Sequence, residues 1–177
     1  GLAALSAVLA VALAFCIAFI AQKTRLRGRG AIEAVAMLPV AIPATVLGLG
    51  LLWAYVTVPL QIYGTVIILV IAYVTRYLPV TLRTVSGGMI QLGDELEEAS
   101  RMSGAGMAFT LRRVVLPLLG PVLFAAGLVM FMAALRELSM SLLLSGLGNP
   151  VVSVAIYNFY SVGETGPLSA LAIVVVE

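Results

Sequence analysis

The sequence predicts an all-α, polytopic membrane helix bundle. Of the 177 residues, 62 % are hydrophobic and only 10 % are charged, whereas a soluble domain carries about 25 % charged residues. Several uncharged runs are about 20 residues long, which is the length that a helix needs to span the hydrocarbon core of a bilayer. The sequence lacks the short alternating segments of a membrane β-barrel. These observations place the chain in a lipid bilayer.

The apolar runs give the order of the spans. The predicted spans are residues 1–21, 34–60, 64–85 and 114–135, and the run 166–176 is expected to begin a fifth. Pro39 and Pro43 interrupt the second run, and a proline in a spanning helix frees a carbonyl that neighbouring helices or water must satisfy. Gly48 and Gly50 in the same run are expected to be positions of close helix packing. About five spans are therefore expected.

The basic residues predict the orientation of these spans. If the spans alternate in direction, the link 22–33 and the segment 86–113 share one side, and the turn 57–63 and the segment 136–165 share the other. The first side carries Lys23, Arg25, Arg27, Arg29, Arg83, Arg101, Arg112 and Arg113. The second side carries only Arg136. Because Lys and Arg accumulate on the cytoplasmic side of membrane proteins, 86–113 is predicted to be cytoplasmic and 136–165 external.

The segment after the third span gathers much of the charge. Four of the eight acidic residues lie between positions 94 and 98, and Asp94 is predicted to be the N-cap of a short helix. Apolar residues recur at helical spacing and predict a stripe along this helix, formed by Leu92, Leu96, Ala99 and Met102 or Ser103. Gly104 and Gly106 are expected to end it. A second short helix is expected at 107–113, leading into the fourth span.

Two kinds of partner fit this amphipathic helix. A helix that lies on lipid headgroups usually presents Lys and Arg to anionic lipid. This helix instead has four acidic residues and one arginine. An acidic helix with an apolar stripe is better suited to a groove on another protein. The sequence therefore favours protein docking over a lipid surface.

The same segment resembles a known motif. Glu98-Ala99-Ser100, three residues, Gly104, nine residues and Val114-Val115-Leu116-Pro117 resemble the EAA loop of ATP-binding-cassette importer permeases. The family pattern is Glu-Ala-Ala, three residues, Gly, nine residues, Ile, any residue, Leu-Pro, so this chain departs from it at Ser100 and Val114. The surrounding spans also resemble this family. The resemblance implies the MetI-like permease fold, with residues 1–177 as a single transmembrane permease domain, incomplete at both ends, and 86–113 as its coupling loop.

The resemblance also implies roles for individual residues. Carried over by position, Glu98 would face a cytoplasmic ATPase, Ala99 and Ser100 would permit its close approach, and Gly104 would make the bend. Leu116 and Pro117 would set the direction of the next span. The implied partners are cytoplasmic ATP-binding subunits, a periplasmic or lipid-anchored solute-binding protein, a second permease half or copy and the lipid bilayer, with no nucleic acid. The implied location is a bacterial or archaeal inner membrane, as a multi-pass protein.

The driving chemistry is expected on another polypeptide. The sequence contains no Walker-type GxxxxGK[ST] motif, so the chain is not expected to be an enzyme, and no catalytic, cofactor-binding or metal-binding residue is expected. Because the chain has no histidine and no carboxylate cluster in a span, proton-coupled transport has few candidate residues. A secondary, ion-coupled transporter remains the alternative, since other parts of a longer protein could hold a relay.

Four residues are candidates for the translocation path: Arg76, Arg136, Glu137 and Ser139. Arg76 lies well inside a run and either lines or gates the path or, as we prefer, snorkels towards the cytoplasmic end. Arg136 and Glu137 either line the path or anchor a helix end.

Two segments suggest the solute. Residues 136–141, Arg-Glu-Leu-Ser-Met-Ser, resemble the Arg-Glu-Leu-Ser segment of ferric-iron-type permeases, and residues 152–157 resemble the same subgroup. Ferric iron is thus one candidate solute. Phosphonate, thiamine and polyamine importers share related stretches and are the alternatives.

Overall fold

The computed structural model describes residues 1–24, 26–57, 64–93, 95–146 and 151–176. Within these ranges the chain is built from helices. Their order is α1 (Leu2–Lys23), α2 (Arg29–Met37), the 3-10 turn η1 (Leu38–Ala41), α3 (Ala44–Thr57), α4 (Val66–Gln91), α5 (Glu95–Met102), α6 (Met107–Thr110), the π-helical turn η2 (Leu111–Val115), α7 (Leu116–Leu135), α8 (Ser139–Leu144), α9 (Val152–Val162) and α10 (Thr165–Val176). The predicted N-cap Asp94, Arg25 and residues 58–63 of the predicted turn 57–63 lie outside the described residues.

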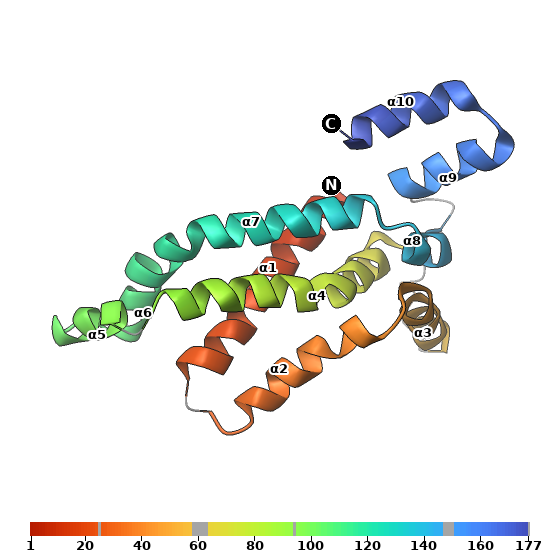
Figure 1. Cartoon of the computed structure of the whole chain (residues 1–177). Coiled ribbons are helices and arrows are strands. Elements are labelled where there is room, and N and C mark those ends of the chain that lie inside the picture. The colour runs from red at the N-terminus through yellow and green to blue at the C-terminus, as the bar shows by residue number, and fades with distance from the viewer. Residues whose placement is uncertain (25, 58–63, 94, 147–150, 177) are drawn as a thin grey trace.

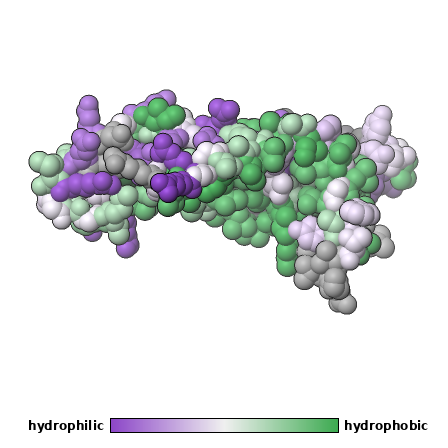
Figure 2. Space-filling view, turned by 90° about the horizontal axis from the view of Figure 1, so that it is seen from below, coloured by the Kyte–Doolittle hydropathy of each residue, from purple (hydrophilic) through white to green (hydrophobic). Residues whose placement is uncertain are grey.

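The molecule is elongated, and its two ends differ in character (Figure 1). One end, here called the charged end, holds α5, α6 and the connection between α1 and α2. The other, here called the opposite end, holds α3, α8, α9 and α10. Figure 2 shows that hydrophilic residues gather at the charged end, whereas the middle of the molecule is mainly hydrophobic. This distribution is that of a bundle whose middle lies in lipid.

Three long helices form the bundle. Among the described residues, α1, α4 and the continuous helix Met107–Leu135 are each long and apolar enough to cross a membrane. Buried alanines on α1, such as Ala7 and Ala10, let it pack closely against α4 and α7. Gly88 on α4 allows a similar approach, because a Cβ there would lie 2.7 Å from the Val122 side chain of α7. Small residues thus bring the three spans together.

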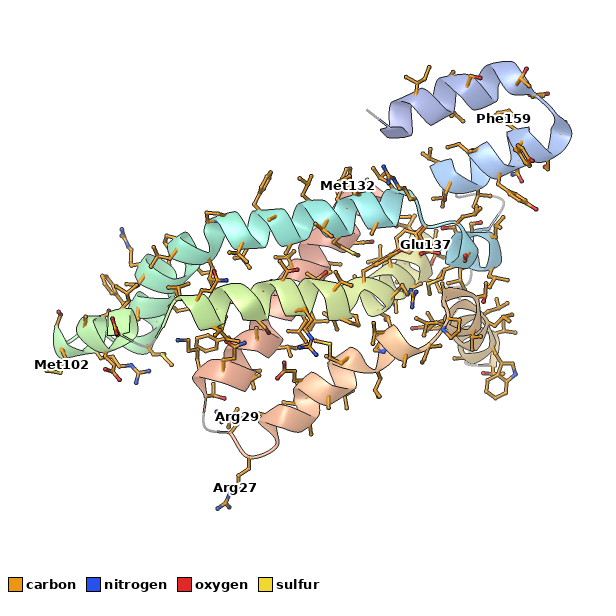
Figure 3. The ribbon with its side chains drawn as sticks, in the orientation of Figure 1. Arg27, Arg29, Met102, Met132, Glu137 and Phe159 are labelled. Carbon is orange, nitrogen blue, oxygen red and sulfur yellow. The ribbon has the colours of Figure 1, made fainter. Side chains whose placement is uncertain are left out.

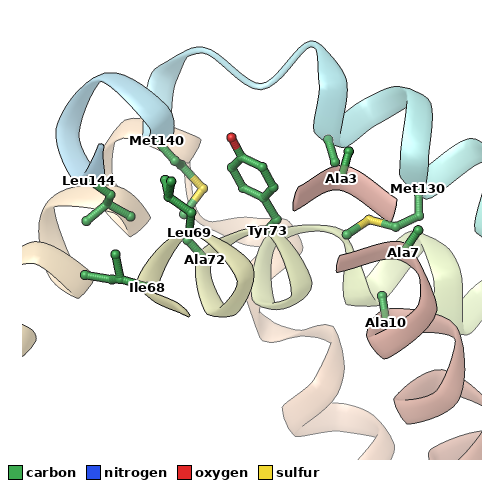
Figure 4. Close-up of a cluster of buried hydrophobic side chains, with 11 residues drawn as sticks. Ala3, Ala7, Ala10, Ile68, Leu69, Ala72, Tyr73, Met130, Met140 and Leu144 are labelled. Carbon is green, nitrogen blue, oxygen red and sulfur yellow. The ribbon is translucent and has the colours of Figure 1, made fainter. Parts of the chain in front are cut away.

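Two apolar clusters fill the bundle. The cluster nearer the opposite end joins α1, α4, α7 and α8 around Tyr73, Met130 and Met140 (Figure 4). The cluster nearer the charged end joins α1, α2, α4 and the start of α7 around Leu82 and Leu119. Each cluster includes residues of α1, α4 and α7, so the three long helices contact one another towards both ends of the bundle.

The second apolar run differs from its expected form as a single span. The helical segments Arg29–Ala41 and Ala44–Thr57 meet at an angle of 110°, so this run is either a broken span or a re-entrant loop. The bend falls between Pro39 and Pro43, and Pro43 lacks the N–H that an α-helix would direct to the Pro39 carbonyl. The described chain therefore has three spans, or four if the bent pair is one span, and α10 covers the run that was expected to begin a fifth.

The two glycines of the bent run have different surroundings. A Cβ at Gly48 would lie 3.1 Å from the Leu143 side chain, so the prediction of close packing is confirmed there, against α8. A Cβ at Gly50 would meet nothing within 4 Å, so that prediction is wrong for Gly50 within this chain. The difference arises because the two glycines face different sides of α3 and only one of them faces α8.

The helix limits also differ from the expected ones. Helix α4 continues to Gln91, past the predicted end of the third span at residue 85, and α2 begins at Arg29, within the predicted link 22–33. The second short helix, expected at 107–113 as a separate element, is joined to the fourth span without interruption from Met107 to Leu135. The charged segment is therefore shorter than expected, and it is joined directly to two long helices.

Candidate functional site

A glycine elbow at the charged end separates α5 from the helix that begins at Met107. Gly104 has φ +79°, a left-handed conformation that glycine adopts without strain. The N–H of Gly104 donates to the Arg101 carbonyl at 2.9 Å, and the N–H of Ala105 donates to the Ser100 carbonyl at 3.1 Å. This pair of bonds is a Schellman motif, which closes the C-terminus of α5. The predicted helix end at Gly104 thus has the backbone geometry that requires glycine.

Five exposed side chains of this region are together called the loop surface. It consists of Leu96, Glu98, Ala99, Met102 and Phe109. Met102 is 88 % exposed and lies at the tip of the charged end (Figure 3). Apolar and acidic side chains are thus exposed together, which is the composition expected of a surface that enters a protein groove. Glu98 and Ala99 both belong to it.

Ser100 lies on the inward side of α5 and contacts the next helix. Its Oγ lies 2.8 Å from Oγ1 of Thr110, a buried residue of α6. The Thr110 hydroxyl also lies 3.3 Å from the Gly106 carbonyl, to which it donates. A hydrogen bond between side chains therefore crosses the elbow. The sequence interpretation missed Thr110, because only the fold brings it within reach of Ser100.

The remaining residues of the predicted loop motif lie where α7 begins. The N–H of Leu116 donates to the Leu111 carbonyl, which closes the π-helical turn, and Pro117 follows it. Proline has no N–H and leaves one further bond of the helix unmade. Both side chains are exposed. Leu116 and Pro117 therefore lie at an irregular turn between the elbow and the span.

A second polar cluster lies at the opposite end, around Glu137 (Figure 3). The Glu137 side chain is only 7 % exposed. Its carboxylate accepts a hydrogen bond from the Tyr77 hydroxyl at 2.5 Å and another from the N–H of Met140 at 3.1 Å. Its backbone carbonyl accepts hydrogen bonds from Ser141 and, at 2.8 Å, from Ser153. Glu137 therefore joins α4, the start of α8, and α9, which supports its role as an anchor of a helix end.

The other predicted path residues have different surroundings. Arg136 is exposed beside Glu137, and Ser139 is half-buried as the first residue of α8. The sequence interpretation missed Tyr73 and Tyr77, one helical turn apart on α4. Tyr73 lies 2.5 Å from the Ser141 hydroxyl, so both tyrosines approach the corner between α7 and α8. Two phenol groups at a spacing of four residues in an apolar run were the signal that could have found them.

Arg76 lies on α4 opposite the bend between η1 and α3. Its Nη1 donates to the Ile42 carbonyl at 2.8 Å and to the Pro39 carbonyl at 3.3 Å. The guanidinium is thus held by backbone oxygens of the bend, and it also supplies a donor at the place where Pro43 supplies none. This arrangement differs from snorkelling towards the charged end. The consecutive residues Arg76 and Tyr77 therefore contact two different interruptions of the helices. Arg76 bonds to the bend between η1 and α3, and Tyr77 bonds to Glu137 between α7 and α8.

Comparison with known proteins identifies the family. The family model described as "Binding-protein-dependent transport system inner membrane component" matches residues 4–176. The chain is 32 % identical, over 93 % of its length, to the ferric transport system permease protein FbpB of Actinobacillus pleuropneumoniae. It is 37 % identical, over 70 % of its length, to a protein of Haemophilus influenzae provisionally named ferric transport system permease protein FbpB 1.

A further relative carries a different solute in its name. The chain is 32 % identical, over 78 % of its length, to a Salmonella typhimurium protein provisionally named 2-aminoethylphosphonate transport system permease protein PhnV. The chain spans 24 %, 20 % and 52 % of the lengths of these three relatives, respectively. It therefore corresponds to a part of each of them.

Proposed function

The chain belongs to the family of binding-protein-dependent transport system inner membrane components, and from this premise we propose that it is the permease subunit of an ATP-driven solute importer. In this proposal, residues 1–177 belong to a single transmembrane domain, and 86–113 are its cytoplasmic coupling loop. ATP is hydrolysed on separate subunits that bind the loop surface. A solute-binding protein delivers solute on the other side, and a second permease half or copy completes the path.

One observation carries the proposal: the side chains of the loop surface are exposed, yet its backbone is held against a span. Glu98, Ala99 and Met102 are exposed, while the Schellman motif and the bond between Ser100 and Thr110 hold α5 against the helix that continues to Leu135. A partner that binds these side chains can thus displace a membrane span. An interfacial anchor would need no such connection, and its polar face would carry Lys and Arg.

Co-purification tests the proposal. We expect an ATP-binding subunit expressed from the same operon to co-purify with the full-length protein. Glu98→Lys should abolish this, because like charges across an interface cost several kcal/mol. Glu164→Lys is the matched control, since Glu164 is also exposed but lies between α9 and α10, at the opposite end (Figure 1). Both variants should reach the membrane in parental amounts. Unchanged co-purification of Glu98→Lys, or uptake that persists without any ATPase, would contradict the proposal.

Ferric iron is the proposed solute. The support is the naming of the two ferric transport relatives, together with the Arg-Glu-Leu-Ser segment at 136–139. Glu137 is buried and bonded within the chain, so in this proposal it stabilises the structure of the segment and does not contact the solute. Uptake of radioactive ferric iron with the cognate binding protein tests the assignment. Uptake of 2-aminoethylphosphonate with iron ignored would contradict it.

A further inference from the structure

We propose that Ser100 and Thr110 form a brace across the glycine elbow, so that α5 and the first turn of the following span move as one unit. This inference rests on the proposed function, because it concerns how displacement of the loop surface reaches the membrane. It adds a positioning residue, Thr110, at one of the nine positions between Gly104 and Val114 where the loop motif specifies no residue. It also gives a physical role to the serine at position 100, where the motif has alanine.

The direction of the hydrogen bonds follows from the acceptors. The Thr110 hydroxyl donates to the Gly106 carbonyl, so its oxygen is free to accept the proton of the Ser100 hydroxyl. The resulting chain runs from Ser100 to Thr110 to Gly106 and crosses the elbow. Thr110 is 1 % exposed, so water cannot readily replace a lost partner there.

Ser100 makes two hydrogen bonds at the elbow, one through its backbone and one through its side chain. The Ser100 carbonyl accepts the N–H of Ala105, and the Ser100 hydroxyl bonds the side chain of Thr110. A single attachment would leave α5 able to pivot about the glycines, whereas two attachments on different sides of the residue restrict that pivot. Helix α5 also packs against α6 and the π-helical turn. The braced unit thus ends at the turn 111–115, where the helix is irregular before Pro117.

The glycine of the elbow does not by itself fix the angle between α5 and the next helix. A left-handed glycine ends a helix without fixing the angle to the next element, because it has no side chain to pack. In the absence of another contact, displacement of α5 by a partner would be absorbed by rotation at the elbow. The bond between two short hydroxyl side chains opposes this rotation, because neither side chain has further rotatable bonds that would let it lengthen. The Arg101 guanidinium, which donates to the Met107 sulfur at 3.4 Å, also crosses the elbow, but through a long and exposed side chain.

Distance measurements between spin labels test the brace. Labels on cysteines at Glu95 and Phe124, both exposed and both outside the loop surface, report the angle between α5 and α7 in an otherwise cysteine-free protein assembled with its ATPase. We expect Ser100→Ala and Thr110→Val each to raise the population of unbraced distances about fivefold, which corresponds to roughly 1 kcal/mol for one hydrogen bond. The distance distribution of the double variant should be no broader than that of Thr110→Val, since both lack the bond across the elbow and the Thr110 bond to the Gly106 carbonyl.

Two controls and a second readout complete the experiment. Thr110→Ser keeps the hydroxyl and should keep the parental distribution. Ser103→Ala should do so as well, because the Ser103 hydroxyl bonds only to the Ala99 carbonyl within its own helix end. The brace variants should retain co-purification but import less ferric iron per ATP hydrolysed.

The outcomes separate this inference from the proposed function. Parental distance distributions in both Ser100→Ala and Thr110→Val would overturn the brace. Absence of an ATPase from purified parental protein would overturn the proposed function, and in that case the distributions are measured on the chain alone in nanodiscs and still decide whether the brace exists.

Discussion

Replacement of Glu137 with alanine separates an anchoring role from a role in the path. The change removes the carboxylate acceptor from the Tyr77 hydroxyl and from the N–H of Met140. Both donors lie in a region where Glu137 itself is 7 % exposed, so water replaces the lost acceptor poorly. Each donor left unsatisfied costs about 1–3 kcal/mol, so Glu137→Ala should lower the free energy of unfolding by about 2–6 kcal/mol. Glu137→Gln keeps one oxygen acceptor and should cost about half as much.

Reversible unfolding in mixed micelles by titration with SDS measures these changes. Arg136→Ala is the matched control, because Arg136 is adjacent but exposed, and it should change the free energy of unfolding by less than about 0.5 kcal/mol. Tyr77→Phe removes the donor of the same bond. Its effect should therefore be smaller in the Glu137→Ala background than in the parent.

Transport assays on the folded fraction test whether Glu137 acts as an anchor or lies in the translocation path. If Glu137 acts as an anchor, uptake per folded molecule should be close to parental in Glu137→Gln. A Glu137→Gln variant that folds with parental stability but transports nothing would refute the anchoring role and would place Glu137 in the path. Parental stability of Glu137→Ala would refute the hydrogen-bond argument itself.

Three further predictions concern the elbow, the bend and the orientation. Gly104→Val should insert in parental amounts but lose ATP-driven uptake and ATPase co-purification, because φ +79° strains a β-branched residue by about 1–3 kcal/mol; parental uptake would contradict it. Arg76→Met should lower the free energy of unfolding in micelles by about 1–3 kcal/mol, since the Ile42 carbonyl loses its charged donor, and unchanged stability would argue that the guanidinium merely snorkels. A single cysteine at Ser161 should react with an impermeant thiol reagent in intact cells and one at Thr24 should not, and the reverse pattern would invert the proposed orientation.

Local signals predicted the features that depend on neighbouring residues. The long apolar runs located the three spans, because a bilayer requires about 20 predominantly apolar residues whatever the surrounding fold. The glycine at 104 located the end of α5, because a left-handed helix cap favours glycine for reasons of its own backbone. Helical periodicity also predicted the stripe that includes Leu96, Ala99 and Met102, which are exposed on α5. The prediction was wrong for Leu92, which is the C-cap of α4 and packs against the cluster nearer the charged end.

Tertiary contacts determined what the sequence could not show. Prolines at 39 and 43 indicated a weak point in the second run, but the 110° bend depends on what the freed backbone groups contact, here Arg76. In the same way, the alternatives for Glu137 stayed open because its partner Tyr77 is 60 residues away. Buried polar groups need partners, but periodicity does not say which residues supply them.

In our proposal, the outer face of α5 binds the partner, and the inner face transmits the displacement to the membrane span. Glu98, Ala99 and Met102 face outwards, so changes there should alter affinity for the partner. Ser100 faces inwards and bonds to Thr110, so a change there should leave affinity intact and alter how displacement is passed on. A sequence pattern that has alanine at this position requires only a small side chain. The Ser100 hydroxyl adds a contact to Thr110 that alanine could not make. We therefore expect related permeases to differ in coupling where the inward face of this helix departs from the motif.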